Sequence, residues 1–195
     1  MKKIFFLLIA VIVFNTSLFA DNNKKIKRIS EGLQDSKITI IAYESLTCSH
    51  CADFHKNVYP KLKKDFIEKG LVKIEFRHFP LDIAAFNASK VAQCKSDEGL
   101  KILNSLYSNQ QEWVRGNTVE EINDNLKKFI KNQGFEVNFE KCINDKKIED
   151  YVLNDRIEGT RKFKVNATPT IIINDEKFDK TLNYKNLKKS LEKLI

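Results

Sequence analysis

Several features are absent from this 195-residue sequence, and each absence removes a class of protein. After Ala20, no stretch is apolar enough to span a membrane, and neither an internal repeat nor a low-complexity tract occurs. The net charge of +8 arises from dispersed lysine pairs without interleaved aromatic residues, which favours a solvated basic surface over a nucleic-acid interface. We therefore expect the sequence after Ala20 to form one soluble domain that binds no nucleic acid.

The N-terminus has the layout of a secretory signal peptide. Lys2 and Lys3 precede the apolar residues 4–14, and Ala20 ends a candidate cleavage site. We expect cleavage after Ala20, which would leave residues 21–195 as a single exported domain. An uncleaved membrane anchor is the alternative, although polar residues interrupt the apolar stretch early.

The strand and helix signals form an α/β pattern that is interrupted once. Residues 38–44 and 71–79 predict two strands on either side of a helix kinked at Pro60. Residues 170–178 predict a β-hairpin around an Asn-Asp turn, followed by a last helix. Residues 21–36 are polar and predict at most one helical turn, too little to build a further domain.

An all-helical block from about residue 82 to 162 interrupts this pattern. Asp82 and Asp97 are the expected N-caps of its first two helices, and Thr118 begins a capping-box pattern before a third. Strand signals are lacking throughout the block. We therefore expect one domain with a helical insertion, not two domains in series.

The Cys48-Ser49-His50-Cys51 motif stands where the first predicted strand ends and the following helix begins. Unpaired backbone N–H groups and the helix dipole at this position favour the thiolate form of Cys48. Cys51, one turn deeper, would resolve mixed disulfides formed at Cys48, and His50 could lower the pKa of Cys48 further. We interpret the pair as a redox-active dithiol that needs no cofactor.

A zinc site, a purely structural disulfide and a pair of buried inert thiols are the competing interpretations of this motif. Inert thiols would not explain the polar Ser49-His50 between the cysteines. Cys48, Cys51 and His55 could bind zinc, but His78 offers no suitably spaced fourth ligand, so we predict no metal site. A disulfide across four residues closes a small ring and stabilises a fold only weakly.

Cys94 and Cys142 fall on different predicted helices of the insertion. They could remain free core thiols. An even number of cysteines in an exported chain permits disulfides, and we expect these two to form a structural one.

Thr168-Pro169 precedes the returning strand. On its own, Pro169 is an ordinary stop at a strand edge. If its peptide bond were cis, the backbone of Thr168 would approach the sulfurs, where it could pair with an extended substrate chain.

Together these motifs resemble the DsbA family of periplasmic disulfide-forming oxidoreductases, especially its alphaproteobacterial-type branch. The resemblance rests on residues 43–51 (YESLTCSHC), 77–82 (RHFPLD) and 166–170 (NATPT), and it extends from about Ser36 to the C-terminus. It implies a thioredoxin fold, with a central mixed sheet flanked by helices and an all-helical insertion.

The resemblance also implies roles for individual residues. Cys48 would be the nucleophile, Cys51 the resolving thiol and His50 the residue that tunes them. Thr168-Pro169 would form the cis-proline loop that binds substrate.

This sequence departs from the family pattern at two places. Ser49 replaces the usual proline, which implies a less oxidising disulfide. The family often has a buried glutamate, a proton relay, at the position of Ala42, whereas this chain has Glu44 two residues later on the same strand face. Glu44 either takes over the relay or is a solvated surface residue.

The implied activity is donation of a disulfide to reduced exported proteins in the periplasm, with reoxidation by a membrane quinone-linked partner of the DsbB type. An isomerase or reductase of the same fold is one alternative, and a thiol-dependent chaperone or metal-binding module is another. Isomerases of this kind usually carry an N-terminal dimerisation region. Only residues 21–36 precede the first predicted strand, so we expect a monomer.

Overall fold

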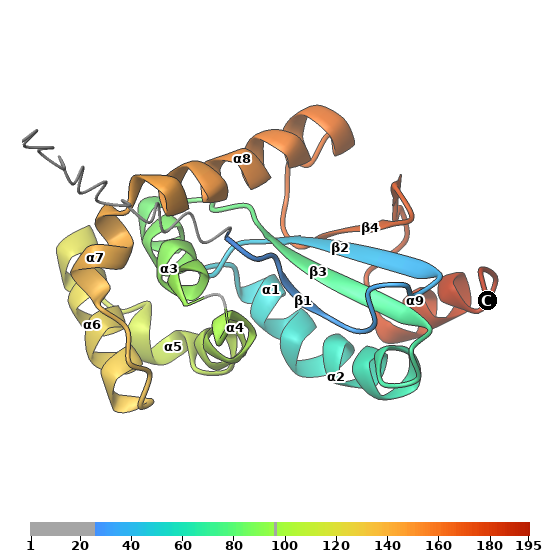
Figure 1. Ribbon diagram of the computed structural model, residues 1–195, viewed down its shortest axis with the longest axis horizontal. Helices are drawn as coiled ribbons and strands as arrows, with labels where there is room; N and C mark the ends of the chain where they lie inside the picture. Colours follow the sequence, from blue (N-terminus) through green and yellow to red (C-terminus); the bar gives the residue numbers. More distant parts are fainter. Residues whose placement is uncertain (1–25, 96) are drawn as a thin grey trace, which may run out of the picture.

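The computed structural model describes residues 26–95 and 97–195, which form a five-stranded mixed sheet with helices on both faces (Figure 1). Along the sheet the order is β1-β3-β2-β4-β5; β2 and β3 are parallel, and the other neighbours are antiparallel. The strands are β1 (Ile29–Glu31), β2 (Ile38–Glu44), β3 (Val72–His78), β4 (Thr170–Ile173) and β5 (Glu176–Lys177). The predicted fold class is confirmed, whereas the leader expected at residues 1–20 lies outside the described residues.

Strand β1 corrects the expectation that residues 21–36 hold at most one helical turn. Its residues pair antiparallel with β3, which puts Ile29 opposite Phe76 in the core. Three residues are too few for alternation to stand out from the polar sequence around them. The pairing supplies partners for backbone groups at the outer edge of β3.

Strand β2 lies at the centre of the sheet and is buried on both faces. Its side chains alternate between two cores because successive residues of a strand point to opposite faces. Ile40 and Ala42 belong to the larger core, and Ile41 and Tyr43 belong to the smaller one. A short, β-branched strand is the expected occupant of such a two-sided environment.

A long helical segment follows β2 and covers the larger core (Figure 1). Pro60 has no N–H to donate to the preceding turn, and a π-helical turn accommodates the loss. The predicted kink thus corresponds to a widened turn. The segment comprises α1 (Ser49–Asp53), a π-helical turn (Phe54–Val58), α2 (Tyr59–Leu62) and a second π-helical turn (Lys63–Ile67).

The block between β3 and β4 is helical throughout its described residues. Within the described ranges, no helix is both long and apolar enough to cross a membrane. The block contains α3 (Ile83–Cys94), α4 (Gly99–Ser108), α5 (Gln110–Trp113), α6 (Val119–Asn132), α7 (Phe139–Asn144) and α8 (Lys146–Phe163), and α9 (Tyr184–Leu191) follows the hairpin.

Two of the three predicted N-caps in this block are confirmed. The Asp82 side chain accepts from Ala85 N at 2.7 Å, and Thr118 Oγ1 accepts from Glu121 N at 3.2 Å. The cap predicted at Asp97 is wrong, because α4 begins one residue later, after Glu98, without a side-chain cap.

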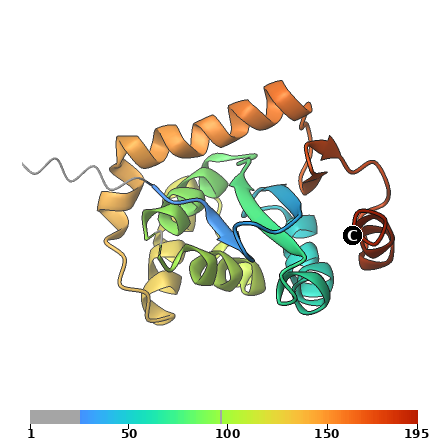
Figure 2. The same ribbon diagram turned by 45° about the vertical axis from the view of Figure 1, so that its right-hand side comes forward.

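Helix α8 crosses one face of the sheet, opposite the helices that follow β2 (Figures 1 and 2). The close approach depends on Gly159, because a Cβ atom there would lie 2.8 Å from Cε1 of Tyr43. Tyr43 is fully buried and packs against Phe79 and Phe163, so its ring has little room to move.

Replacing Gly159 by alanine is therefore expected to lower the free energy of unfolding by about 1–3 kcal/mol, as overpacking of a full core does. Urea denaturation measures it. Thr160→Ala, at an exposed position of the same helix, is the control and should change stability little. An unchanged or higher stability of the Gly159 variant would mean that α8 moves away from the sheet at small cost.

Candidate functional site

Cys48 occupies the N-cap of the helical segment after β2. Its backbone is extended, and its carbonyl accepts from Cys51 N and Ala52 N, both at 3.1 Å, which starts the first turn. The geometry leaves the Cys48 side chain half-buried at the open end of the helix, while Cys51 is fully buried one turn on. Both are unbonded thiols.

The surroundings of Cys48 favour its thiolate. They lower the pKa of Cys48 to about 5, mainly through a hydrogen bond from the Cys51 side chain. The side chain of Thr168 and the backbone N–H groups of Cys51 and His50 act in the same direction, while partial burial opposes them. At neutral pH, Cys48 is therefore mainly a thiolate.

Cys51 has the opposite environment. Burial is the largest cause of a strongly raised pKa, and hydrogen bonding to Cys48 and the charge of Glu44 add to it. Cys51 therefore remains a thiol at neutral pH, and it can ionise readily only if a nearby group takes its proton.

The Thr168-Pro169 loop lies against the nucleophile. The peptide bond before Pro169 is cis, and the Cys48 Sγ atom lies 3.3 Å from the Thr168 carbonyl oxygen. A thiol at Cys48 donates to this carbonyl. A thiolate cannot donate, and the Thr168 side chain, whose hydroxyl is buried and without a partner among the described residues, favours this charged form of the sulfur. Both protonation states of Cys48 thus have a partner on the same residue.

His50 lies in the first turn with an exposed side chain. Its backbone N–H helps to lower the pKa of Cys48. The ring makes no hydrogen bond to any residue that the structure describes. Any further contribution of the ring would come from its charge.

Glu44 is 3% exposed, so its interpretation as a solvated surface residue is excluded. Its Oε2 atom lies 2.9 Å from Nε2 of His55, and its Oε1 atom has no hydrogen-bond partner among the described residues. The sequence suggested His55 only as a zinc ligand, whereas in the structure its ring faces the Glu44 carboxylate.

Gln110 is a second contact that sequence reasoning missed. Its Nε2 atom donates to the carbonyl oxygens of Leu46 at 2.7 Å and of Cys48 at 3.1 Å. Gln110 begins α5, a four-residue helix with no recognisable periodicity, so only the following Trp113 signalled an ordered element there. The contact ties the helical block to the loop that carries the nucleophile.

Cys94 of α3 and Cys142 of α7 are joined by a disulfide that closes a 48-residue separation. Lys90, one turn before Cys94, reinforces the junction by donating to the carbonyl of Ile143 at 2.5 Å. The bond lies within the helical block, apart from the dithiol.

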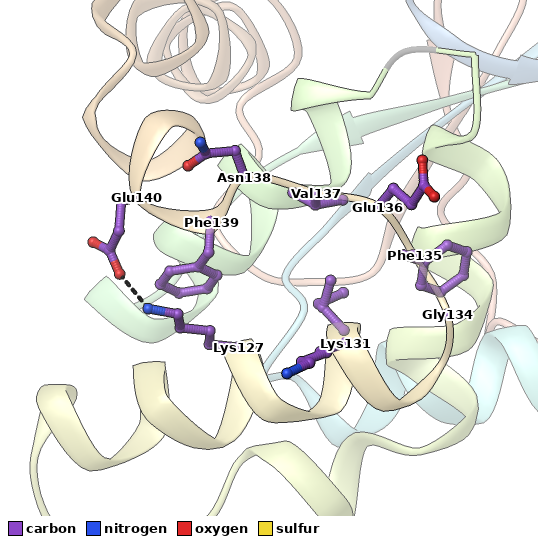
Figure 3. A pocket seen from close by; sticks show the side chains of 10 residues that line it. Lys127, Lys131, Gly134, Phe135, Glu136, Val137, Asn138, Phe139 and Glu140 are labelled. Atoms are coloured by element: carbon purple, nitrogen blue, oxygen red, sulfur yellow. Dashed lines mark hydrogen bonds and ion pairs between the residues drawn. The ribbon is translucent and has the colours of Figure 1, made fainter.

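The pocket between the end of α6 and the start of α7 contains none of these groups (Figure 3). It encloses about 560 Å³, has a mainly apolar wall of Phe135, Val137 and Phe139, and is bordered by the Lys127–Glu140 ion pair. Because no cysteine lines this pocket, thiol chemistry does not take place in it.

Comparison with known proteins places this chain among thiol–disulfide proteins. A family model described as thioredoxin matches residues 24–193. A putative protein-disulfide oxidoreductase of Rickettsia bellii is 28% identical over 145 residues, which are 73% of this chain and 55% of that protein. This chain thus spans about half the length of the rickettsial relative.

Two further similarities cover more of the compared proteins. Disulfide bond formation protein D of Bacillus subtilis is 28% identical over 172 residues, which are 83% of this chain and 74% of that protein. The crystal structure of Wolbachia pipientis alpha-DsbA1 superposes with a TM-score of 0.76 at 29% identity, covering 86% of this chain and 90% of that chain.

Replacing either Cys94 or Cys142 by alanine is expected to lower the free energy of unfolding by about 2–5 kcal/mol, because the unfolded chain gains freedom. Denaturant titration measures this change. The pKa of Cys48 should stay near its value in the unchanged protein. Equal stability of the protein with and without a reductant that opens this bond would show that it contributes nothing.

We also expect ultraviolet absorbance of the Cys48 thiolate to titrate well below the value of about 8.5 for free cysteine. We expect His50→Ala to raise this pKa, but less than Cys51→Ala, which removes the largest stabilising contact. A midpoint near that of free cysteine would contradict thiolate stabilisation. No change on His50→Ala would remove the His50 ring from the site.

Proposed function

The chain belongs to the thioredoxin family, and we propose that it acts as a DsbA-like protein thiol–disulfide oxidoreductase through Cys48 and Cys51. The contrast between the two thiols carries the proposal. The pKa of Cys48 is lowered to about 5, whereas that of Cys51 is raised, although they are one turn apart. Such a pair has one sulfur suited to attack and departure and one suited to resolve.

In the oxidising direction, a substrate thiolate attacks the Cys48 sulfur of the Cys48–Cys51 disulfide. The S–S bond breaks, and Cys51 leaves as a thiolate that takes up a proton. A second substrate thiolate then attacks the substrate sulfur of the mixed disulfide, and Cys48 departs with the electron pair. The substrate loses two electrons and two thiol protons. The reduced enzyme holds the electrons as a Cys48 thiolate and a Cys51 thiol, and the second proton goes to solvent.

The low pKa of Cys48 favours this direction over reduction. A stabilised thiolate is a good leaving group, and it makes the reduced enzyme the more stable form. His50 would add to this stabilisation by its charge. Ser49 in place of proline points to a weaker oxidant than the family norm.

Substrates would be reduced, incompletely folded proteins. The Thr168 carbonyl, next to the Cys48 sulfur, is available to pair with an extended chain. Leu81 and Ile83 are 49% and 57% exposed, and the residue between them, Asp82, accepts from the hydroxyl of Thr47 at 2.6 Å. This contact holds exposed apolar side chains beside the nucleophile, where apolar segments of a substrate could bind.

The proposed site of action is the periplasm, reached through the leader at residues 1–20. The Cys94–Cys142 disulfide supports an oxidising compartment. The protein would act there as a monomer and would be reoxidised by a membrane quinone-linked partner of the DsbB type.

Equilibration with glutathione redox buffers tests the proposed direction. An oxidase should equilibrate at a more positive potential than a reductase, with half of the dithiol remaining reduced in relatively oxidising mixtures. An equilibrium deep in the reducing range would favour the reductase alternative. Failure to exchange with glutathione would end the oxidoreductase proposal and favour a chaperone.

Exchange with substrate should also be trapped differently by the two cysteine variants. Cys51→Ser should accumulate mixed disulfides between Cys48 and exported proteins, because the resolving thiol is missing. Cys48→Ser should accumulate almost none, since its remaining thiol is buried and protonated. Non-reducing gels of the two variants measure the difference. Equal trapping through Cys51 would reverse the assigned roles.

A further inference from the structure

A chain of buried polar contacts leads from Glu44 toward the surface. His55 Nε2 lies 2.9 Å from Glu44, and its Nδ1 lies 3.2 Å from Oδ1 of Asn104. The Asn104 side chain also lies near enough to the hydroxyl of Tyr59 to lower its pKa, and that hydroxyl donates to Glu31 at 2.5 Å. These five side chains come from different elements and lie in one row, which we call the file: Glu44, His55, Asn104, Tyr59 and Glu31.

The end of this file is anchored at the protein surface. Lys63 Nζ lies 2.6 Å from the second carboxylate oxygen of Glu31, and both side chains are partly exposed. Glu31 therefore remains an acceptor for the Tyr59 hydroxyl.

The file fixes the tautomer of His55. The atom of Asn104 that lies against His55 Nδ1 is the carbonyl oxygen Oδ1, which can only accept. His55 Nδ1 must then carry a hydrogen, and Nε2 faces Glu44. One exchangeable proton is left for His55 Nε2 and Glu44 Oε2 to share.

Packing prevents the His55 ring from turning away. The ring stacks on Tyr107 with centroids 4.1 Å apart, and the rings of Tyr59 and Phe76 lie at 5.3 Å. His55 is 8% exposed, so water competes little for its nitrogen atoms. The pair with Glu44 is therefore held in one geometry.

We propose that His55 is a positioning residue that holds Glu44, and shares a proton with it, for proton exchange with Cys51. The inference rests on the proposed function and on Glu44 as the relay. Glu44 is suited to this exchange because its Oε1 is buried and unpartnered among the described residues. Its charge also acts directly on Cys51.

One proton moves in each resolving step. When the enzyme disulfide opens, the shared proton passes through Glu44 to the Cys51 sulfur, leaving Glu44 as a carboxylate and His55 as a neutral imidazole. Solvent then returns a proton to the pair. In the reverse direction, Cys51 gives its proton to the pair as its sulfur attacks a mixed disulfide at Cys48, and the departing thiolate carries away the electron pair.

Few titratable groups other than His55 and Glu44 can make the rate of attack by Cys51 depend on pH. Those that face His55 and Glu44 from the surrounding elements are Tyr59 of α2, Tyr107 of α4, His78 of β3, Cys48 and Cys51 at α1, and, beyond Tyr59, Glu31 of β1 with Lys63. His78 lies opposite Glu44 in the sheet, and burial lowers its pKa, so it stays neutral. Burial raises the pKa of both tyrosines, so they stay neutral in the range of the test.

A two-step colour reaction tests the role of His55 in the full protein. The reduced protein is mixed with a symmetrical nitrophenyl disulfide, whose released thiolate absorbs visible light. Attack by Cys48 releases the first thiolate, and attack by Cys51 on the mixed disulfide releases the second. The second rate is recorded against pH, and the first serves as an internal control for folding.

His55→Gln should leave the rate of the first step unchanged and slow the second step about tenfold at neutral pH, which is part of the acceleration that a general base supplies. The pH profile of the second step should also move to higher pH. Glu44→Gln should slow the same step. The double variant should be no slower than Glu44→Gln alone, because both residues act through one proton. Additive effects, or an unaltered second step in His55→Gln, would overturn the proposal.

A milder pair of variants guards against misfolding. Tyr59→Phe removes the hydroxyl that lies between Asn104 and Glu31 and should slow the second step about two- to threefold. Tyr184→Phe is the matched control, since it removes a hydroxyl bonded to the carboxylate of Asp65 outside this file. It should change neither step. An equal effect of the two tyrosine variants would overturn the role of the file. Absence of the second release from the unchanged protein would instead refute the proposed function.

Discussion

The antiparallel pairing of β2 with β4 determines where the chemistry can occur. Tyr43 lies opposite Thr170 in this antiparallel pair. The residues that follow Tyr43 and those that precede Thr170 therefore leave the sheet at the same end of the two strands. Cys48 and Thr168 therefore meet although they are 120 residues apart. Burial of Tyr43 under α8 locks this register, because a slip by one residue would turn its ring into the other core.

Two thiols of one motif differ because the helix carries one of them inward. Cys48 receives hydrogen bonds at the helix start, whereas Cys51 shares the larger core with apolar side chains. Burial makes the second thiol reluctant to ionise, and the same burial requires any acid or base that serves it to be buried as well. Glu44, the last residue of the preceding strand β2, meets this requirement, and a buried carboxylate persists only with a partner such as His55.

Much of the fold and the dithiol could be predicted from the sequence, because their signals are local. Strands β2 and β3 are short apolar or alternating runs, and Asn174 and Asp175 mark the hairpin by adopting positive φ. Strand β1 and helix α5 were not predicted, since three or four residues give no period.

The contacts of the site were harder to predict than its cysteines. Glu44 and His55 lie on different elements, and their pairing depends on how a π-helical turn rotates the helix over the sheet. Gln110 reaches the loop of Cys48 from the helical block, a contact between segments more than 60 residues apart. No pattern in one segment records the orientation of another.

The contact made by Gln110 limits how the domain could be shortened. Its amide satisfies the carbonyl oxygens of Leu46 and Cys48, which are partly shielded from water beneath α5. A minimal scaffold without the helical block would keep the sheet and the two cysteines but leave these carbonyls without that donor. The insertion therefore supports the loop that carries Cys48, and a shortened version of this protein would need another hydrogen-bond donor for the carbonyls of Leu46 and Cys48.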